Sequence, residues 1–301
     1  RVFFRFLQES NLALMSKPMT DVSIADLSSL QPVDFEEFQE YLKAYKGPDN
    51  KLETNSRTGI ARKMSCLRSF YDYLCKRKLL PSNPVRLVDM PKIKEKAIIQ
   101  LDPDEVANLL DYIENYGNQL TGVKLYHYNK QKYRDIAIVT LLLGTGVRVS
   151  ELVGLNISDI DFKNNGIRIL RKGGNEMIVY FGEEVEKALH DYLEISRNAM
   201  TPLSGHEDAL FLSGQRRRIS VDAVEKMVKK YASAISAKTI TPHKLRSTYG
   251  TALYRETGDI YLVADVLGHA DVNTTKKHYA KLSDARRRAA SKAVILREKI
   301  D

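Results

Sequence analysis

The side chains best suited to chemistry in this 301-residue chain are Arg148, His243, Arg246, His269 and Tyr279. Two arginines, two histidines and a tyrosine could attack a phosphodiester without a metal. Such a reaction needs cations that hold the non-bridging oxygens, a nucleophile, a group that accepts its proton and an acid for the leaving oxygen. Guanidinium suits the first task, because its planar fork makes paired hydrogen bonds and stays charged.

Each of these residues also has an ordinary explanation when it stands alone. Arg148 follows Gly144-Thr145-Gly146 and precedes a predicted helix start, where backbone N–H groups favour an anion. A surface arginine at a helix cap would have the same surroundings. His243 and Arg246 are three positions apart, so a helix would place them on one face. Such a pair is common by chance, and only the whole ordered set is informative.

Hydrophobic periodicity predicts that the segment before residue 90 is helical. Phe35, Phe38, Tyr41 and Leu42 have helical spacing, and the turn residues 47–50 end that segment. A second amphipathic helix is predicted from an apolar stripe. The stripe consists of Ile60, Met64, Leu67, Tyr71 and Leu74.

The later part of the chain mixes helices with one predicted hairpin. Asp102 is a predicted N-cap before Pro103, and residues 221–237 have a helical pattern. Residues 116–132 show no clear period, and we expect a loop insertion there. Residues 166–171 and 177–181 favour strands joined by a Gly-Gly turn, so they predict a β-hairpin with Lys172 at its tip.

Basic side chains are concentrated in residues 57–96, which carry 11 basic and 3 acidic groups (11 − 3 = +8), against 6 and 9 (6 − 9 = −3) in residues 1–56. This favours a polyanionic partner, although a solvated charged face is the commoner reason for a basic stretch. No apolar run reaches the ~18 residues of a membrane helix, and two cysteines suggest neither a disulfide framework nor a zinc site. The sequence begins without Met, so we expect that an N-terminal extension is missing.

The ordered motifs resemble the tyrosine recombinase/integrase family over nearly the whole chain. The resemblance implies a mainly α fold with a small β-sheet or hairpin (α+β), in which two domains form a C-shaped clamp on DNA. Residues 58–74, followed by Asn83-Pro84, resemble its core-binding domain. The implied division is a helical, SAM-like core-binding domain in residues 1–90, a linker in 91–100, and a catalytic domain in 101–301. The motifs are Gly144-Thr145-Gly146-x-Arg148-x-Ser150-Glu151-Leu152, the hairpin lysine, His243-x-x-Arg246, Leu267-Gly268-His269 and Tyr279.

The resemblance also implies roles for individual residues. Arg148 and Arg246 correspond to the pair that clamps the scissile phosphate. Lys172 corresponds to the general acid toward the 5′-oxygen. Glu151 corresponds to an acid that supports the active-site arginine.

The remaining three positions complete the implied chemistry. His243 is a candidate acceptor for the tyrosine proton, and His269 corresponds to a residue that hydrogen-bonds the phosphate. Tyr279 corresponds to the nucleophile, which forms a 3′-phosphotyrosyl link. Two transesterifications follow, and they require no ATP, metal or cofactor, since the link keeps the energy of the broken bond.

Double-stranded DNA is the implied partner, with basic residues of both domains on its phosphates. We also expect a homotetramer on two DNA sites that exchanges a C-terminal helix, residues 290–300, with a directionality factor as a further candidate partner. The membrane is not an expected partner, and the expected location is the bacterial cytoplasm, in association with the nucleoid. The predicted DNA contacts are Arg57, Arg62, Lys63 and Arg68 in the first domain, and Arg216, Lys226, Lys229 and Lys230 in the second.

Several functions remain open within this interpretation. An active recombinase could integrate or excise a mobile element, transposition included, or it could resolve chromosome dimers in the manner of Xer proteins. The expected insertion at 116–132 and the start without Met favour the mobile-element role. A type IB topoisomerase shares the chemistry, but the core-binding segment and the terminal helix argue against it. A non-catalytic DNA-binding regulator is disfavoured, because all six chemical positions carry competent residues.

Overall fold

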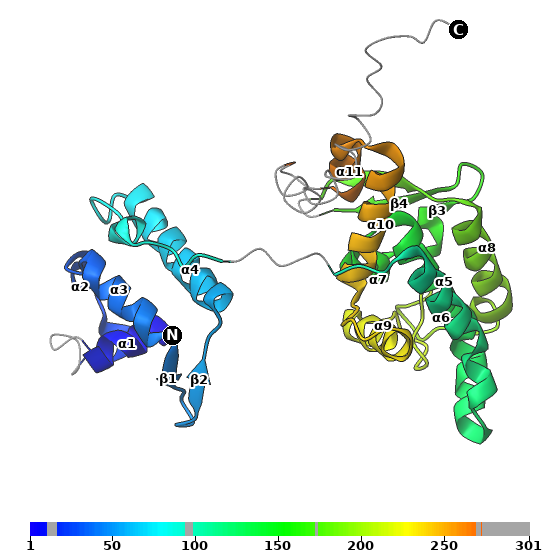
Figure 1. Cartoon of the computed structure of the whole chain (residues 1–301), viewed down its shortest axis with the longest axis horizontal. Helices are drawn as coiled ribbons and strands as arrows, with labels where there is room; N and C mark the ends of the chain where they lie inside the picture. Colours follow the sequence, from blue (N-terminus) through cyan, green and yellow to red (C-terminus); the bar gives the residue numbers. More distant parts are fainter. Residues whose placement is uncertain (11–16, 94–98, 172–173, 269–271, 273–301) are drawn as a thin grey trace, which may run out of the picture. The chain divides into compact units, whose positions relative to one another are not determined.

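The chain divides into two compact units, Arg1–Lys96 and Ala97–Asp301, in the computed structural model (Figure 1). The structure describes residues 1–10, 17–93, 99–171, 174–268 and 272. Within those residues, helices dominate both units and the strands form two small antiparallel sheets. This confirms the predicted α+β class. No helix in the described part of the chain combines the length and apolarity that crossing a membrane demands.

The first unit is a cluster of helices around an aromatic core. Phe3 of α1 stacks on Phe35 of α3 with ring centroids 5.6 Å apart and meets Phe38 edge-on at 5.0 Å. All three rings are buried, so they join the two helices. The elements are α1 (Val2–Ser10), η1 (Met19–Asp21), α2 (Ile24–Ser28), α3 (Pro32–Tyr41), β1 (Ala44–Lys46), β2 (Leu52–Thr54), α4 (Arg57–Lys76) and η2 (Pro84–Leu87).

Helix α4 has the amphipathic character that its sequence predicts. Ser56 caps it, because the Ser56 hydroxyl accepts a hydrogen bond from the N–H of Gly59 at 3.2 Å. Four members of the predicted apolar stripe are buried and Leu67 is partly buried against the same core. The opposite face of α4 is therefore left to solvent.

The sequence did not predict the hairpin formed by β1 and β2. Ala44 pairs with Thr54 and Lys46 with Leu52, and Asn50 adopts a left-handed φ of 62° in the turn. Each strand has only three residues, which is too short for an alternating pattern to be visible.

The second unit is built around α6, which packs against α5, α8, η5 and α10 (Figure 1). Residues 137–139, 141 and 142 of this helix are fully buried. The elements are α5 (Pro103–Asn115), η3 (Tyr116–Gln119), α6 (Gly122–Thr145), α7 (Val149–Gly154), η4 (Ile157–Asp159), β3 (Ile160–Asp161), β4 (Gly166–Leu170), β5 (Glu176–Tyr180), α8 (Glu183–Asp191), the π-helical turn η5 (Tyr192–Arg197), α9 (Val221–Ile235), α10 (Pro242–Thr257) and α11 (Ile260–Leu267).

The prediction that residues 116–132 form a loop insertion is wrong. Helix α6 begins at Gly122 and runs without a break to Thr145. Its first turns are held by Tyr128, whose hydroxyl donates to the carbonyl oxygens of Ile113 and Glu114 at 2.8 and 2.7 Å. Most other side chains in these turns face solvent, so the segment lacks the apolar stripe that identifies a helix from sequence.

The predicted hairpin between residues 166 and 181 is confirmed and is joined by a third strand. The sheet order is β3-β4-β5, all antiparallel, with Gly166 opposite Tyr180 and Leu170 opposite Glu176. Beyond the paired strands, the N–H of Arg171 donates to the carbonyl oxygen of Asn175 at 2.9 Å. The predicted tip residue, Lys172, lies outside the described residues.

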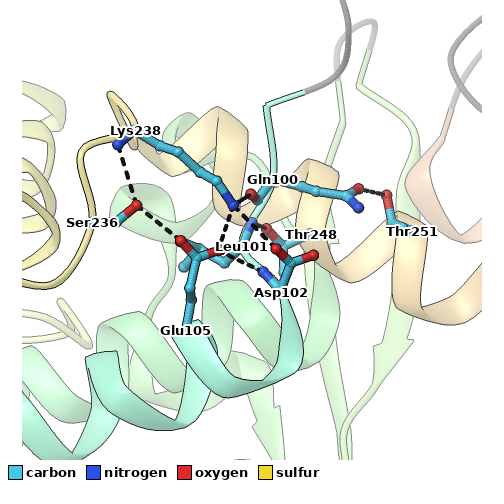
Figure 2. A network of polar contacts seen from close by, with 8 residues as sticks. All are labelled: Gln100, Leu101, Asp102, Glu105, Ser236, Lys238, Thr248 and Thr251. Carbon is cyan, nitrogen blue, oxygen red and sulfur yellow. Dashed lines mark hydrogen bonds and ion pairs between the residues drawn. The ribbon is translucent and has the colours of Figure 1, made fainter.

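A polar network fastens the start of the second unit to α10 (Figure 2). The N–H of Leu101 donates to the Thr248 hydroxyl at 3.0 Å. The Lys238 ammonium donates to the Gln100 carbonyl oxygen at 3.1 Å and to the Glu105 carboxylate at 2.5 Å. The helix that carries His243 and Arg246 is thus tied to the chain entering the second unit.

Helix α5 begins where its sequence predicts. Asp102 is the N-cap, Pro103 follows it, and the Glu105 carboxylate accepts a hydrogen bond from the Asp102 N–H at 2.8 Å. The hydrogen bond from Lys238 holds the pKa of Glu105 below its ordinary value, and the Asp102 N–H acts in the same direction.

Candidate active site

The left-handed turn that ends α6 positions Arg148. Gly146 has a φ of 64°, and its N–H donates to the carbonyl oxygen of Leu142 at 3.1 Å. A Cβ on Gly146 would lie 2.4 Å from the Tyr249 ring of α10 and 2.9 Å from the Leu267 side chain of α11. Only glycine meets both the conformation and the close approach. The chain then passes through Val147 to Arg148, the N-cap of α7.

Arg148 is held by Glu151, three residues further on. One carboxylate oxygen accepts from Arg148 Nη1 and the other from the Arg148 backbone N–H, both at 2.7 Å. The Glu151 side chain is 5% exposed and that of Arg148 38%, so a buried anion anchors a guanidinium that solvent reaches. The backbone N–H expected to attract an anion at this helix start is therefore occupied by Glu151 itself.

Arg246 reaches the same region from the first turns of α10. It is 5% exposed, and its Nη1 donates to the carbonyl oxygen of Gly146 at 2.5 Å. Its Nη2 donates to the carbonyl oxygen of Leu267. Burying a guanidinium is favourable only when hydrogen bonds replace its hydration, which these carbonyl groups help to do.

Three guanidinium groups converge on the last turn of α11. Besides Arg246, Arg148 Nη2 donates at 2.9 Å, and Arg171 donates through Nη2 at 2.7 Å and Nη1 at 3.3 Å. The final carbonyl groups of a helix lack partners inside it and carry partial negative charge, so cations are favoured there. The acceptors are the carbonyl oxygens of Asp265, Val266, Leu267 and Gly268.

Burial and neighbouring charges shift the pKa values of two side chains in this region. Burial lowers the pKa of the Arg171 guanidinium; the Glu151 carboxylate raises it, and the charge of Arg148 lowers it. Burial also raises the pKa of the Tyr249 hydroxyl.

Arg148 and Arg246 can act together on one anion. They bond the carbonyl oxygens of consecutive residues, Gly268 and Leu267. Two guanidinium groups directed at neighbouring carbonyl oxygens can instead bind two oxygens of one phosphate. The phosphate oxygens are charged, so they accept stronger hydrogen bonds than neutral carbonyl groups do.

The remaining predicted catalytic residues are placed to different degrees. His243 is exposed on the first turn of α10, one turn before Arg246. Lys172, His269 and Tyr279 lie outside the described residues. Arg171 and Gly268, which precede Lys172 and His269 in the chain, are in contact.

Three of the predicted DNA contacts in the first unit lie on or near the open face of α4. Arg57 and Arg62 are exposed, and Lys63 is half-buried. The Lys63 ammonium donates to the side chain of Asn55 at 2.5 Å, which draws it toward the start of the helix.

Arg68 differs from these three. Its guanidinium donates to the carbonyl oxygens of Val85 at 3.1 Å and Val88 at 2.5 Å. Arg68 therefore fastens the segment around η2 to α4, and only part of its donor capacity remains for a phosphate.

The predicted contacts in the second unit are all at the surface. Lys226 pairs with Asp222 at 2.8 Å, one turn earlier on α9. The Lys230 ammonium lies 4.2 Å from the centre of the Tyr116 ring, where a cation is attracted to the π face. The exposed residues are Arg216, Lys226, Lys229 and Lys230.

Sequence reasoning missed Arg171 as a member of this cluster. Its only signal was its place at the end of the first hairpin strand, directly before Lys172. The part of the chain that the structure describes holds no group of His, Cys, Asp and Glu residues arranged for a metal ion.

Comparison with known proteins gives one consistent family. The sequence model of the phage integrase family matches residues 100–286. Tyrosine recombinase XerC of Caldanaerobacter subterraneus subsp. tengcongensis is 33% identical over 298 residues, which cover 96% of this chain and 77% of the relative. Tyrosine recombinase XerS of Streptococcus pneumoniae is 33% identical over 308 residues, which cover 95% and 86%.

Solved structures show the same likeness. The crystal structure of XerA recombinase aligns with a TM-score of 0.55 at 26% identity, over 98% of this chain and 92% of that one. The Tn1549 transposon integrase, in complex with circular intermediate DNA, aligns with a TM-score of 0.65 at 21% identity, over 96% and 97%. At that identity the second likeness concerns the fold alone.

Proposed function

Since the chain belongs to the phage integrase family of tyrosine recombinases and is a site-specific DNA recombinase, we propose that it cuts and rejoins double-stranded DNA through a 3′-phosphotyrosyl link to Tyr279. One observation carries the site assignment. Arg148 and Arg246 lie 98 positions apart in the sequence (246 − 148 = 98) and donate to the carbonyl oxygens of consecutive residues. A single phosphate in their place would receive both forks.

In this proposal the two arginines bind the non-bridging oxygens of the scissile phosphate. They neutralise its charge and stabilise the extra negative charge of the pentacoordinate transition state. Glu151 holds Arg148 in the orientation that this requires, through the 2.7 Å pair described above. His269 donates a further hydrogen bond to the phosphate.

The covalent step exchanges one ester for another. His243 accepts the phenolic proton, the Tyr279 oxygen attacks phosphorus, and the bond from phosphorus to the 5′-oxygen breaks. Lys172 gives its proton to that oxygen, which leaves as a 5′-hydroxyl. A second 5′-hydroxyl then reverses the step and releases Tyr279. Each step makes one phosphate ester and breaks one, so no external energy source is needed.

In this proposal both units contribute phosphate contacts to duplex DNA, the first through the basic face of α4 and the second through the lysines of α9. Phosphate contacts of this kind supply affinity and register. We propose a homotetramer on two DNA sites in which residues 290–300 of each chain dock on a neighbour.

Two biological roles follow from this chemistry. Integration or excision of a mobile element was favoured by the expected loop insertion at residues 116–132. That argument loses its weight because residues 116–119 form η3 and residues 122–132 belong to α6. Resolution of chromosome dimers is the second candidate, and the 33% identity to XerC and XerS over nearly the whole chain favours it.

Recovery of the covalent protein–DNA adduct from cells tests the function and separates the roles. The adduct is purified under denaturing conditions, and the attached DNA ends are sequenced, with Tyr279→Phe as the matched control. If the protein is a site-specific recombinase, the attached ends should map to a single recurrent site. Its location at a chromosomal locus or at the ends of a mobile element decides the role. Adducts spread over random sequence would contradict site-specific recombination and favour a topoisomerase.

A further inference from the structure

Arg171 ties the β4–β5 hairpin to the end of α11. It follows the last paired residue of β4, and its guanidinium donates to the carbonyl oxygens of Val266 at 2.7 Å and Asp265 at 3.3 Å. These partners are 95 and 94 residues away in the sequence. Two elements distant in sequence are thereby joined through one side chain.

Gly268 leaves room for this side chain. A Cβ at Gly268 would lie 2.1 Å from Arg171 Nη1 and 2.3 Å from the central guanidinium carbon. The guanidinium therefore lies directly against the glycine backbone, which also adopts a left-handed φ of 60°. Any side chain at residue 268 would displace Arg171, so the two residues form a matched pair.

The contact between Arg171 and Gly268 is adjacent in the chain to two residues with proposed catalytic roles. Arg171 directly precedes Lys172, and Gly268 directly precedes His269. The carbonyl oxygen of Gly268 also accepts a hydrogen bond from Arg148 at 2.9 Å. A shift of the hairpin relative to α11 would change the place of Lys172 with respect to the phosphate that Arg148 binds.

Arg171 stabilises its contact with α11 through two hydrogen bonds, but one of its donors opposes that gain. Its Nε is buried and has no hydrogen-bond partner among the described residues. The Glu151 carboxylate favours the charged guanidinium of Arg171, and the positive charge of Arg148 opposes it. A buried donor without a partner opposes folding.

We propose that Arg171 is a positioning residue, which fixes the hairpin on α11 so that Lys172 delivers its proton to the 5′-oxygen of the phosphate held by Arg148. This inference rests on the proposed function, and in particular on Lys172 as the general acid.

A sulfur-substituted substrate gives the test. In a 5′-bridging phosphorothiolate duplex, sulfur replaces the 5′-oxygen at the scissile bond. The leaving group is then a thiolate, which departs without a proton because thiols are far stronger acids than alcohols. Adduct formation in a single turnover is measured on normal and sulfur duplexes for wild type, Arg171→Ala, Arg171→Lys and Lys172→Ala. The matched control is Arg168→Ala, which removes an exposed arginine of β4, the strand that Arg171 follows.

Arg171→Ala should cleave the normal duplex roughly 10- to 100-fold more slowly, the loss expected when a reacting group is misplaced. On the sulfur duplex it should approach the wild-type rate, with little change in DNA affinity on either duplex. Arg171→Lys should be intermediate, because an ammonium makes one contact where the guanidinium makes two. Arg168→Ala should match wild type throughout.

Two results would overturn the inference. One is a wild-type rate of Arg171→Ala on the normal duplex; the other is an equal slowing on both duplexes, since a general structural defect is not repaired by sulfur. If Arg171→Ala does not fold, the ratio of the two rates in Arg171→Lys decides. Lys172→Ala distinguishes a failure of the proposed function from a failure of this inference. If the sulfur duplex does not restore cleavage by Lys172→Ala, Lys172 is not the general acid. If it restores Lys172→Ala but not the Arg171 variants, Lys172 remains the acid and the positioning role of Arg171 is wrong.

Discussion

At the scale of residues, the site depends on how each guanidinium is held. Arg148 is fixed by a buried carboxylate and remains accessible, whereas Arg246 is buried and held by carbonyl groups. The two therefore differ in exposure: solvent reaches the Arg148 side chain, whereas Arg246 is 5% exposed. In both cases the fork geometry of arginine determines the hydrogen bonds, and charge alone would not reproduce it.

Arg148→Lys tests this dependence on geometry. Lysine keeps the positive charge but lacks the planar fork, in which one nitrogen bonds Glu151 while the other is directed at the phosphate. We expect single-turnover cleavage of a nicked duplex to fall by about 10²- to 10³-fold, with DNA affinity changed only a few-fold. Arg168→Lys is the control. Cleavage at a near-normal rate would mean that Arg148 merely caps α7.

At the scale of elements, periodicity predicted the helices that bury one face. It missed the segments that are stabilised by contacts distant in the sequence. The stripe of α4 and the cap of α5 were visible in the sequence, because each depends on residues close in the chain. The first turns of α6 were not, since Tyr128 finds its partners on α5. Arg171 was missed for the same reason: its partners on α11 are some 95 residues away. The order of the motifs indicated which residues meet, but not that α11 is where three of the arginines converge.

The network at the start of α5 gives a prediction about pH. Lys238 lowers the pKa of Glu105, so the stabilisation is complete above the unfolded carboxylate value of about 4.3 and is lost as pH falls through the lower folded value. Lys238 has a raised pKa through the same bond, so its contribution is complete below about 10.4 and is lost as pH rises through the folded value. The pair therefore stabilises the second unit across neutral pH.

Glu105→Gln should lower the free energy of unfolding by about 1 kcal/mol at pH 7. The difference from wild type should shrink as the pH falls below about 4. Chemical denaturation over this pH range measures it, with the exposed Glu225→Gln as control. A difference that stays constant with pH would show that the Lys238 bond contributes nothing.

At the scale of the whole molecule, the two units carry different surfaces. The first has its own aromatic core and carries the basic helix α4, and the second carries the arginine cluster. The proposed homotetramer would join four copies on two DNA sites, an arrangement that one chain does not contain. The resemblance supplied the expectation of a tetramer, for which composition and periodicity gave no signal.

Removal of residues 285–301 tests the assembly. The shortened chain should bind one duplex site and cleave a nicked substrate, but it should fail to bring two duplexes together and exchange strands. Sedimentation of the protein–DNA complexes measures this, and the intact chain is the control. Strand exchange at the full rate would show that this segment is not the exchanged element.

We propose above that Arg148, Arg246 and Tyr279 act on a single phosphate. The most direct measurement traps the protein on a nicked suicide duplex, digests the complex and identifies by mass spectrometry the peptide that carries the nucleotide. We expect the adduct on Tyr279, its absence in Tyr279→Phe and strong depletion in Arg148→Ala and Arg246→Ala. A nucleotide attached to another residue, or an adduct that persists in Tyr279→Phe, would contradict it.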